Sequence, residues 1–392
     1  MLRQRGRPMA FMILLVSLAF AACQSVTGNT TGASPTRSTP SVSPLPQSTV
    51  PVDATSTSHR IEQYLNQLDA KGNVTGAILV ARGSTVLLNK GYGLASEEQH
   101  IANTSQTRFR IGSNTKQFTA MAILQLQQRG KLNVHDKLCQ YITDCPPDWS
   151  SITLQELLTH TSGIRDYTNF TDFPGLIGSP VTVPDLIERF KHLTLSFTPG
   201  SRWSYSNSNY VLLGYIIERL SGQTYADFIE QNIFQPLQMH ESGYDSNSPP
   251  LPSHAAGYLS PGVHPVYLDM SEFYAAGALY STVGDLYKWD RALMTQQLVP
   301  AAALADMFAI HIPCPSGGCL LSSDLGYGYG WFIADQSGHR YDYHWGRVDG
   351  FQSSNGFYPQ DQVIVIVLSN LETSDTWGIS VRLGDLALGI NA

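Results

Sequence analysis

The tetrapeptide Ser113-Asn114-Thr115-Lys116 follows Ile111-Gly112 and opens a stretch, 115–129, whose apolar residues have helical spacing. Residues three apart lie on one face of a helix, so we expect Ser113 and Lys116 to lie side by side. A serine hydroxyl becomes a good nucleophile when a base removes its proton, and a desolvated lysine amine can be that base. Taken alone, the pattern also fits an N-cap serine followed by a surface lysine.

A second short motif, Tyr205-Ser206-Asn207, lies far downstream. Tyr205 and Asn207 are two residues apart, so in an extended chain their side chains point the same way. A phenol close to a lysine can be held as phenolate or can relay a proton, and an asparagine amide can orient a substrate carbonyl. The motif also fits a loop tyrosine that packs on Trp203, with the asparagine in a turn.

The third motif, His344-Trp345-Gly346, stands at the end of a predicted strand, 340–344. A strand that lines a cleft can direct backbone N–H groups towards an acyl oxygen. We expect the N–H groups of Ser113 and Arg347 to form such an oxyanion hole, which contributes strongly to acyl transfer. Gly346 would let a substrate approach closely. Taken alone, the motif also fits a histidine at a strand end.

In this order and at these distances, the three motifs resemble those of the serine β-lactamase-like family. That family includes class C β-lactamases, D-Ala-D-Ala carboxypeptidases, D-aminopeptidases and related esterases. The resemblance covers roughly residues 60–390, and His160 and Trp203 within it are interpreted as scaffold. The runs that carry it, besides the motifs, are 157–164, 199–207, 209–214, 236–237, 276–282 and 328–331.

The resemblance implies a two-step hydrolysis of an ester or amide in a small-molecule or peptide substrate. Ser113 would attack the carbonyl and form an acyl-enzyme, while Lys116 and Tyr205 accept and return its proton. Water, activated by the same pair, would release the acyl group. The residues implied for substrate or oxyanion contacts are Asn207, His344, Gly346 and Arg347. No cofactor or metal is implied.

The third motif departs from the Lys-Thr-Gly or His-Thr-Gly that is usual in the family. Trp345 replaces a threonine whose hydroxyl normally helps to bind a substrate carboxylate, and it adds bulk unless it points away. Arg347 or His344 could supply the lost contact. We therefore expect weak or absent turnover of penicillins, and the departure favours an esterase or a peptidase with another preference.

The periodicity of the chain predicts an α+β fold, in which strands from both termini form one antiparallel sheet flanked by helices. A mainly helical region is inserted between them. The predicted helices are 59–70, 115–129, 153–159, 183–191, 208–220, 225–232, 283–294 and 375–390. The predicted strands are 76–80, 85–88, 330–334, 340–344, 350–358 and 363–369.

The first 22 residues are typical of a signal peptide, with three arginines before an apolar stretch that is too short for a permanent membrane span. Small residues before Cys23 resemble the lipobox of bacterial lipoproteins, and the alternative is a plain secretory signal. Residues 23–58 are rich in Ser, Thr and Pro, which predicts a disordered tether to a hydrolase domain at 59–392. We expect an exported protein of the cell envelope, anchored through a lipid on Cys23.

The chain has five cysteines, and four of them form two local pairs. Cys139 with Cys145, and Cys314 with Cys319, are plausible disulfides in an oxidising compartment, and the alternative is four free thiols. This leaves Cys23 alone, as a lipid-bearing cysteine would be. The spacing does not favour a zinc site.

The composition is that of a globular protein of 392 residues, 42% hydrophobic, with a formal net charge of −7. The sequence shows no basic cluster beyond its first seven residues, which argues against a nucleic-acid partner. It leaves the oligomeric state open. The competing hypothesis to a hydrolase is a non-catalytic wall-binding or penicillin-sensing protein on the same scaffold.

Overall fold

A computed structural model of the chain describes residues 53–247, 253–315, 319 and 321–390. The predicted signal peptide, Cys23 and most of the expected tether lie outside the described residues. The first helix, α1 (Ala54–Asp69), begins five residues before the expected domain start at 59. Asp53 caps it, because its carboxylate accepts hydrogen bonds from the backbone N–H groups of Thr55 and Ser56.

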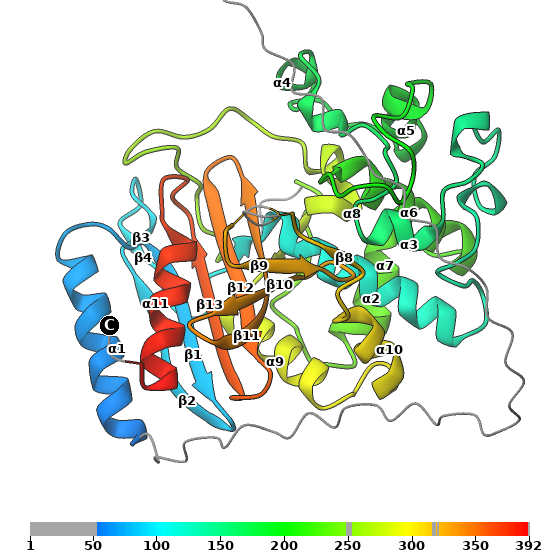
Figure 1. Ribbon diagram of the computed structural model, residues 1–392. Coiled ribbons are helices and arrows are strands. Elements are labelled where there is room, and N and C mark those ends of the chain that lie inside the picture. Colours follow the sequence, from blue (N-terminus) through cyan, green and yellow to red (C-terminus); the bar gives the residue numbers. More distant parts are fainter. Residues whose placement is uncertain (1–52, 248–252, 316–318, 320, 391–392) are drawn as a thin grey trace, which may run out of the picture. The chain divides into compact units, whose positions relative to one another are not determined.

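The predicted antiparallel sheet from both ends of the domain is confirmed. Its eight strands lie in the order β2-β1-β13-β12-β11-β10-β9-β8. Strand β1 pairs with β13, with Ala77 opposite Leu368, and Figure 1 shows these strands side by side. The strands are β1 (Gly76–Arg82), β2 (Thr85–Tyr92), β8 (Ile312–Pro313), β9 (Asp324–Tyr327), β10 (Phe332–Gln336), β11 (His339–Val348), β12 (Phe351–Tyr358) and β13 (Val363–Ser369).

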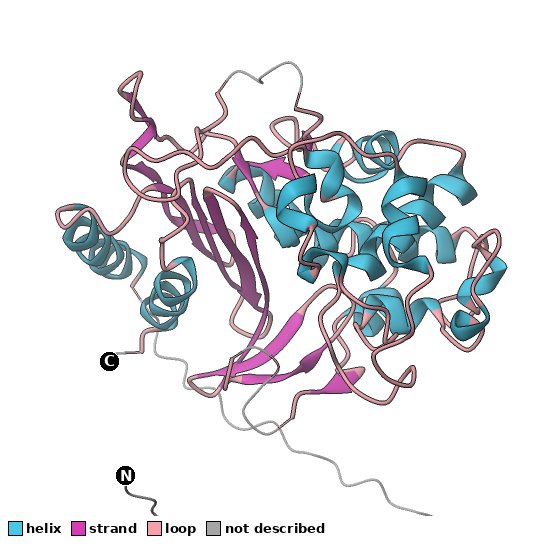
Figure 2. Cartoon of the chain, turned by 90° about the horizontal axis from the view of Figure 1, so that it is seen from above, coloured by secondary structure: helices cyan, strands magenta, loops and turns pink. Residues whose placement is uncertain are grey.

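Helices cover both faces of this sheet (Figure 2). One face packs against α1 and α11 (Thr376–Leu388) around a core that includes Ile61 and Leu383. The other packs against the inserted helical region, where α2 (Thr115–Gln128) is buried along most of its length. A helix that is buried on every side lies at the centre of a fold rather than on its surface. The first turn of α2 is therefore held rigidly from all sides.

The inserted region contains the predicted helices in slightly altered form. They are α3 (Leu154–Leu158), α5 (Val183–Lys191), α6 (Asn207–Ser221), α7 (Tyr225–Ile229) and α9 (Val283–Met294). Short elements that the periodicity did not predict are β8 and β9 of the main sheet, α4 (Phe173–Leu176), α8 (Tyr274–Gly277), α10 (Ala301–Met307), the hairpin strands β3 (Leu94–Ser96) and β4 (Ile101–Ala102), and a small sheet of β5 (Phe109–Arg110), β7 (Leu279–Ser281) and β6 (Gly243–Tyr244).

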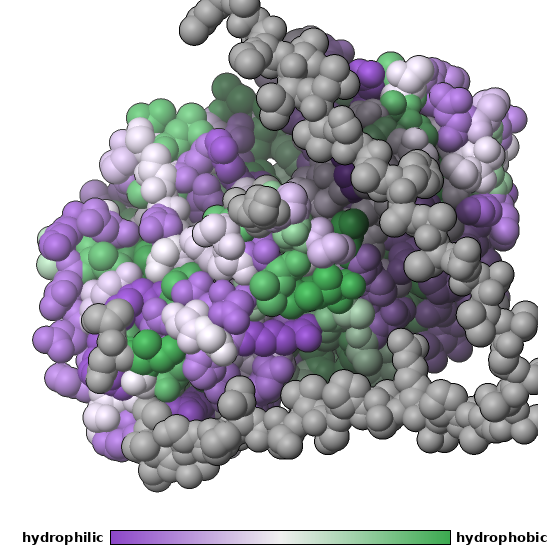
Figure 3. Space-filling model, in the orientation of Figure 1, coloured by the Kyte–Doolittle hydropathy of each residue, from purple (hydrophilic) through white to green (hydrophobic). Residues whose placement is uncertain are grey.

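Both expected disulfides are present, joining Cys139 to Cys145 and Cys314 to Cys319. Within the described ranges, no helix is both long and apolar enough to cross a bilayer. On the face drawn in Figure 3, apolar side chains gather over β8 and β9, where Ile310 and Leu325 are nearly half exposed.

Candidate active site

Ser113 lies in a tight 3-10 turn, Gly112–Asn114, between β5 and α2. The turn depends on Gly112, whose φ of +50° is unfavourable for other residues. A Cβ atom at this position would also come within 2.8 Å of the backbone nitrogen of Arg347. The half-buried Ser113 is thus fixed at the start of the central helix, against the edge of β11.

Lys116 is fully buried beside Ser113, as the spacing predicted. Its Nζ atom is 3.1 Å from Ser113 Oγ and 2.8 Å from both Asn207 Oδ1 and the carbonyl oxygen of Ala276. A neutral amine has two N–H donors and one lone pair. It can donate to the two carbonyl oxygens and accept from the Ser113 hydroxyl, whereas an ammonium group would donate to all three oxygens, so these neighbours can satisfy either form.

The electrostatics of the pocket agree with a neutral amine. Burial lowers the pKa of Lys116 to about 7, and the carboxyl group of Asp166 opposes this in part. A lysine with such a pKa is available as a base near neutral pH.

Tyr205 and Asn207 both reach Lys116, and the residue between them, Ser206, has the expected extended backbone (φ −149°, ψ 118°). Asn207 is the first residue of α6, and Tyr205 lies two residues before it in the entering loop. The Tyr205 ring centroid is 4.8 Å from Lys116 Nζ. Burial raises the pKa of Tyr205, and a hydrogen bond with the Ser113 hydroxyl opposes this only in part. The phenol is therefore neutral and suited to relaying a proton.

Asp166 is a member of this cluster that the sequence reasoning missed. Its carboxylate accepts hydrogen bonds from Asn207 Nδ2, with the shorter contact at 3.2 Å, and from Thr168. Because Asn207 Nδ2 is held by Asp166, its Oδ1 faces Lys116. Burial raises the pKa of Asp166, while Thr168 and Lys116 act in the opposite direction.

The third motif lies inside β11 rather than at the end of a strand, because β11 continues to Val348. A Cβ atom on Gly346 would lie 2.0 Å from the Ile111 carbonyl oxygen and 2.9 Å from Ser113 N. Glycine here therefore lets the backbone of β11 run directly alongside the nucleophile turn. The backbone nitrogens of Ser113 and Arg347 consequently lie in adjacent, closely packed segments.

Trp345 and Arg347 point away from the nucleophile face. Side chains alternate along a strand, and Gly346 is paired with Ser353, which bonds to the nucleophile turn. The adjacent Trp345 consequently packs with the core on the α11 side. The Arg347 guanidinium forms an ion pair with Glu372 and is more than half exposed. The tryptophan therefore adds no bulk beside Ser113.

His344 is on the nucleophile face but is buried. Its Nδ1 is 2.6 Å from the Trp345 carbonyl oxygen, and its Nε2 is 3.2 Å from the hydroxyl of Tyr327. Burial, together with the nearby Lys116, lowers the pKa of His344 to about 3. The imidazole is neutral and both nitrogens are bonded, so it brings no positive charge to a substrate carboxylate.

His160 forms the wall behind Tyr205, in agreement with its interpretation as scaffold. It is fully buried, and its ring centroid is 4.3 Å from that of Tyr205. Its Nδ1 accepts a hydrogen bond from the backbone N–H of Ser206. Burial holds its pKa well below the usual value, so it is neutral. Trp203 packs at the edge of the same aromatic group.

A network of buried side-chain hydrogen bonds supports the nucleophile turn. Asn114 Nδ2 donates to Ser353 Oγ at 2.7 Å, and Ser353 Oγ donates to the Ile111 carbonyl. Gln117 Nε2 donates to Asn114 Oδ1 at 3.2 Å. The Asn355 amide donates to Gln117 and also to Asp290. Burial raises the pKa of Asp290 well above its usual range. The network joins α2, α9 and β12 under Ser113.

Comparison with known proteins agrees with this geometry. The family model described as Beta-lactamase matches residues 61–382. The putative penicillin-binding protein PbpX of Bacillus subtilis (strain 168) is 33% identical over 322 residues, covering 81% of this chain and 75% of that protein.

Two solved structures are also similar. The penicillin-binding protein from Bacillus halodurans is 29% identical with a TM-score of 0.73, covering 82% of this chain and 99% of that chain. The D-stereospecific amidohydrolase from Streptomyces sp. is 26% identical with a TM-score of 0.70, covering 87% of this chain and all of that chain.

Proposed function

The chain belongs to the β-lactamase family, and we propose that it hydrolyses an ester or amide through an acyl-enzyme on Ser113. The observation that carries the proposal is the position of Lys116. Its fully buried amine is 3.1 Å from Ser113 Oγ, and its pKa is lowered to about 7. A neutral amine at hydrogen-bond distance from a serine hydroxyl can remove its proton during attack.

In the first step Ser113 Oγ attacks the substrate carbonyl carbon, and its proton passes to Lys116. The N–H groups of Ser113 and Arg347 stabilise the resulting oxyanion. The scissile bond then breaks, the leaving group takes a proton from the Tyr205 phenol, and Lys116 returns a proton to Tyr205. The nearby carboxyl group of Asp166 favours the ammonium form of Lys116, so it supports the charge created in this step.

In the second step water attacks the acyl-enzyme carbonyl. The Tyr205–Lys116 pair accepts a proton from the water, and the same oxyanion contacts support the tetrahedral intermediate. When the bond to Ser113 Oγ breaks, the proton returns to that oxygen. The product acid leaves, and Lys116 is again neutral.

The third motif bears on the substrate class. His344 is neutral and internally bonded, and the Arg347 side chain is held by Glu372. Neither supplies a cation next to Ser113 for a substrate carboxylate. We therefore propose a substrate whose recognition does not depend on a free carboxylate, such as an amino acid amide or an ester. Relatedness to the D-stereospecific amidohydrolase supports an amide. Penicillins are expected to be poor substrates.

The test is intact mass of the protein after incubation with a fluorophosphonate, with Ser113→Ala alongside. A single adduct that is absent from the variant is expected. No adduct on folded protein, combined with binding to peptidoglycan, would instead favour the non-catalytic hypothesis. A D-amino acid amide, a D-Ala-D-Ala peptide, a p-nitrophenyl ester and a penicillin then compare the substrate classes, and efficient penicillin turnover would contradict the substrate assignment.

We also propose that the protein is exported and anchored by a lipid on Cys23. The support is the signal-like composition of residues 1–22 and the two disulfides, which persist in oxidising compartments. Metabolic labelling with a palmitate analogue would test this, because Cys23→Ala should abolish the label. A label that survives the substitution would refute the anchor.

A further inference from the structure

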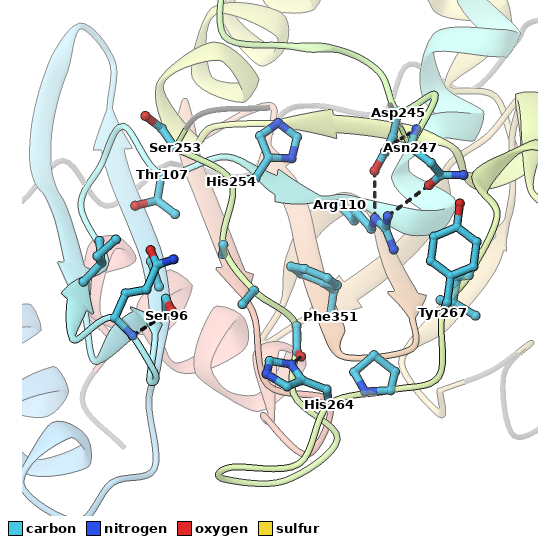
Figure 4. A pocket seen from close by; sticks show the side chains of 18 of the residues that line it. Ser96, Thr107, Arg110, Asp245, Asn247, Ser253, His254, His264, Tyr267 and Phe351 are labelled. Carbon is cyan, nitrogen blue, oxygen red and sulfur yellow. Dashed lines mark hydrogen bonds and ion pairs between the residues drawn. The ribbon is translucent and has the colours of Figure 1, made fainter. Parts of the chain in front are cut away.

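A cavity of about 940 Å³ is lined by Arg110, three residues before Ser113, and by none of the described residues that contact Lys116. Its walls come from the β3–β4 hairpin, from β5 and from the segments that flank Asp245 and His264 (Figure 4). Figure 4 shows Arg110 and Phe351 pointing into its centre, with Tyr267 on one side and Ser96 on the other. The volume is at the upper end of the range for small-molecule sites, so the cavity has room for a ligand of more than one ring.

The cavity is joined to the active site through short stretches of backbone. Arg110 is the last residue of β5, directly before the nucleophile turn. On another side, the Ala278 carbonyl accepts a hydrogen bond from the N–H of Asp245, which lines the cavity. Two residues earlier, the Ala276 carbonyl accepts one from Lys116. A ligand in the cavity would therefore contact the same elements that hold the catalytic groups.

The charged groups around the cavity are already matched. Arg110 Nε is 2.8 Å from Asp245 Oδ2, and the guanidinium also donates to Asn247. His264 Nε2 is 2.8 Å from Glu98 Oε1. A charged ligand would have to compete with these pairs, at a cost in desolvation and in lost partners. The charge pattern thus favours an uncharged ligand.

The rest of the lining combines apolar surface with uncharged polar groups. Tyr267 and Val266 are 62% and 68% exposed, which is unusual for side chains of this size. Opposite them is the nearly buried ring of Phe351, with the Arg110 guanidinium 5.9 Å from its centroid. Among the uncharged polar side chains of the lining, Ser96 is bonded to Glu98 and Thr104 to Thr107. Gln99, Gln106 and Ser253 extend this polar part of the lining.

A peptide bound as an added strand fits this cavity poorly. Such binding needs a free strand edge for backbone hydrogen bonds. The edge of β5 is covered, because Arg108 N donates to the Ser253 carbonyl and Ala255 N donates to the Arg108 carbonyl, each at 3.0 Å. The other strand edge in the lining, that of β4, is only two residues long, too short for a peptide to pair along it, so recognition depends on side chains.

We propose that this cavity binds a neutral saccharide of two or more rings. Sugar rings present C–H faces that pack on aromatic rings such as Tyr267, and hydroxyls that pair with amides and alcohols. A neutral saccharide fits these features, which are matched charges, an exposed aromatic ring at Tyr267 and uncharged polar side chains such as Gln99 and Gln106. The binding goes beyond the proposed hydrolysis and does not require Ser113 to be active.

The test is calorimetric titration of the full-length protein with tri-N-acetylchitotriose, with maltotriose as a second probe and a neutral tetrapeptide as competitor. Binding of one sugar in the millimolar range is expected. Tyr267→Ala should weaken it about fivefold, the order of one stacked ring, and Gln106→Ala should also weaken it. Val86→Ala, an exposed apolar position on β2, is the matched control and should bind like wild type.

Three results would overturn the proposal. One is that neither sugar binds wild type at millimolar concentration. Another is that binding survives Tyr267→Ala unchanged, which would place it elsewhere. The third is that the tetrapeptide binds at Tyr267 and the sugars do not. Fluorophosphonate labelling of the same samples reports on Ser113 separately, so failure of the saccharide proposal and failure of the hydrolase proposal are distinguishable.

Discussion

Replacing Lys116 by methionine should change how the stability of the protein depends on pH. The pKa of Lys116 is lowered from its ordinary 10.5 to about 7 by burial. Between these pH values the unfolded chain holds one more proton than the folded protein, so folding of wild type becomes more favourable as pH rises, by about 1.4 kcal/mol per pH unit. At and below pH 7 the full cost of burying the amine is present, about 5 kcal/mol.

Methionine has a similar volume and no charge, so it removes this dependence. It also leaves Asn207 Oδ1 and the Ala276 carbonyl without their donor, which costs about 1–3 kcal/mol for each group. That penalty is the same at every pH. The slope with pH, rather than the absolute difference, therefore reports the protonation state of Lys116.

The assay is urea unfolding of wild type and Lys116→Met at several pH values from 6 to 9. The stability of wild type relative to the variant should be nearly flat near pH 6 and should rise by about 2 kcal/mol between pH 7 and pH 9. Lys131→Met, at an exposed position, is the control and should show no such rise. Parallel profiles for wild type and Lys116→Met would mean that Lys116 stays protonated, which would refute its role as a neutral base.

Three further predictions concern activity and the support of the site. The rate at which a fluorophosphonate phosphonylates Ser113, with loss of fluoride, should rise with pH through an apparent pKa near 7, since only neutral Lys116 is a base; a profile without an inflection between pH 5 and 9 would contradict this. Asp166→Asn removes the carboxyl group that raises the pKa of Lys116, so the same inflection should move to lower pH, and a move to higher pH would argue against the assignment. Gly346→Ala should reduce acylation by about 100-fold or more, because the new Cβ would lie 2.0 Å from the Ile111 carbonyl, while circular dichroism should show a retained fold; unchanged labelling would show that the contact with β11 is dispensable.

Much of the fold could be predicted from the sequence because its longer elements have clear periodicity. Strands β1 and β13 are continuous apolar runs, and α9 and α11 have apolar spacing typical of helices. The short strands of the small sheet could not be predicted in this way. Strand β5 has only two residues, too few for any periodicity, and its position depends on contacts with β7, far away in the chain.

The candidate site likewise contains residues that could be predicted from the sequence and residues that could not. Ser113 and Lys116 share one helical turn, so local spacing was enough to bring them together. Asp166 could not be found from its neighbours, because an aspartate two residues before a threonine is a common turn cap. Its contact with Asn207 exists only in the folded protein. The direction of Trp345 was open for a related reason, since alternation along a strand fixes which residues share a face but not which face is inward.

The pairing of β1 with β13 determines when, during folding, the surroundings of Ser113 are completed. A ribosome delivers Ser113 and Lys116 long before residues 339–369, yet Gly346 of β11 completes the surroundings of Ser113. The helical region can begin to fold while the sheet still lacks its middle strands, and long-range strand pairing is slow to form. The turn that carries Ser113 therefore reaches its final surroundings only when the C-terminal strands pair with β1 and complete the sheet.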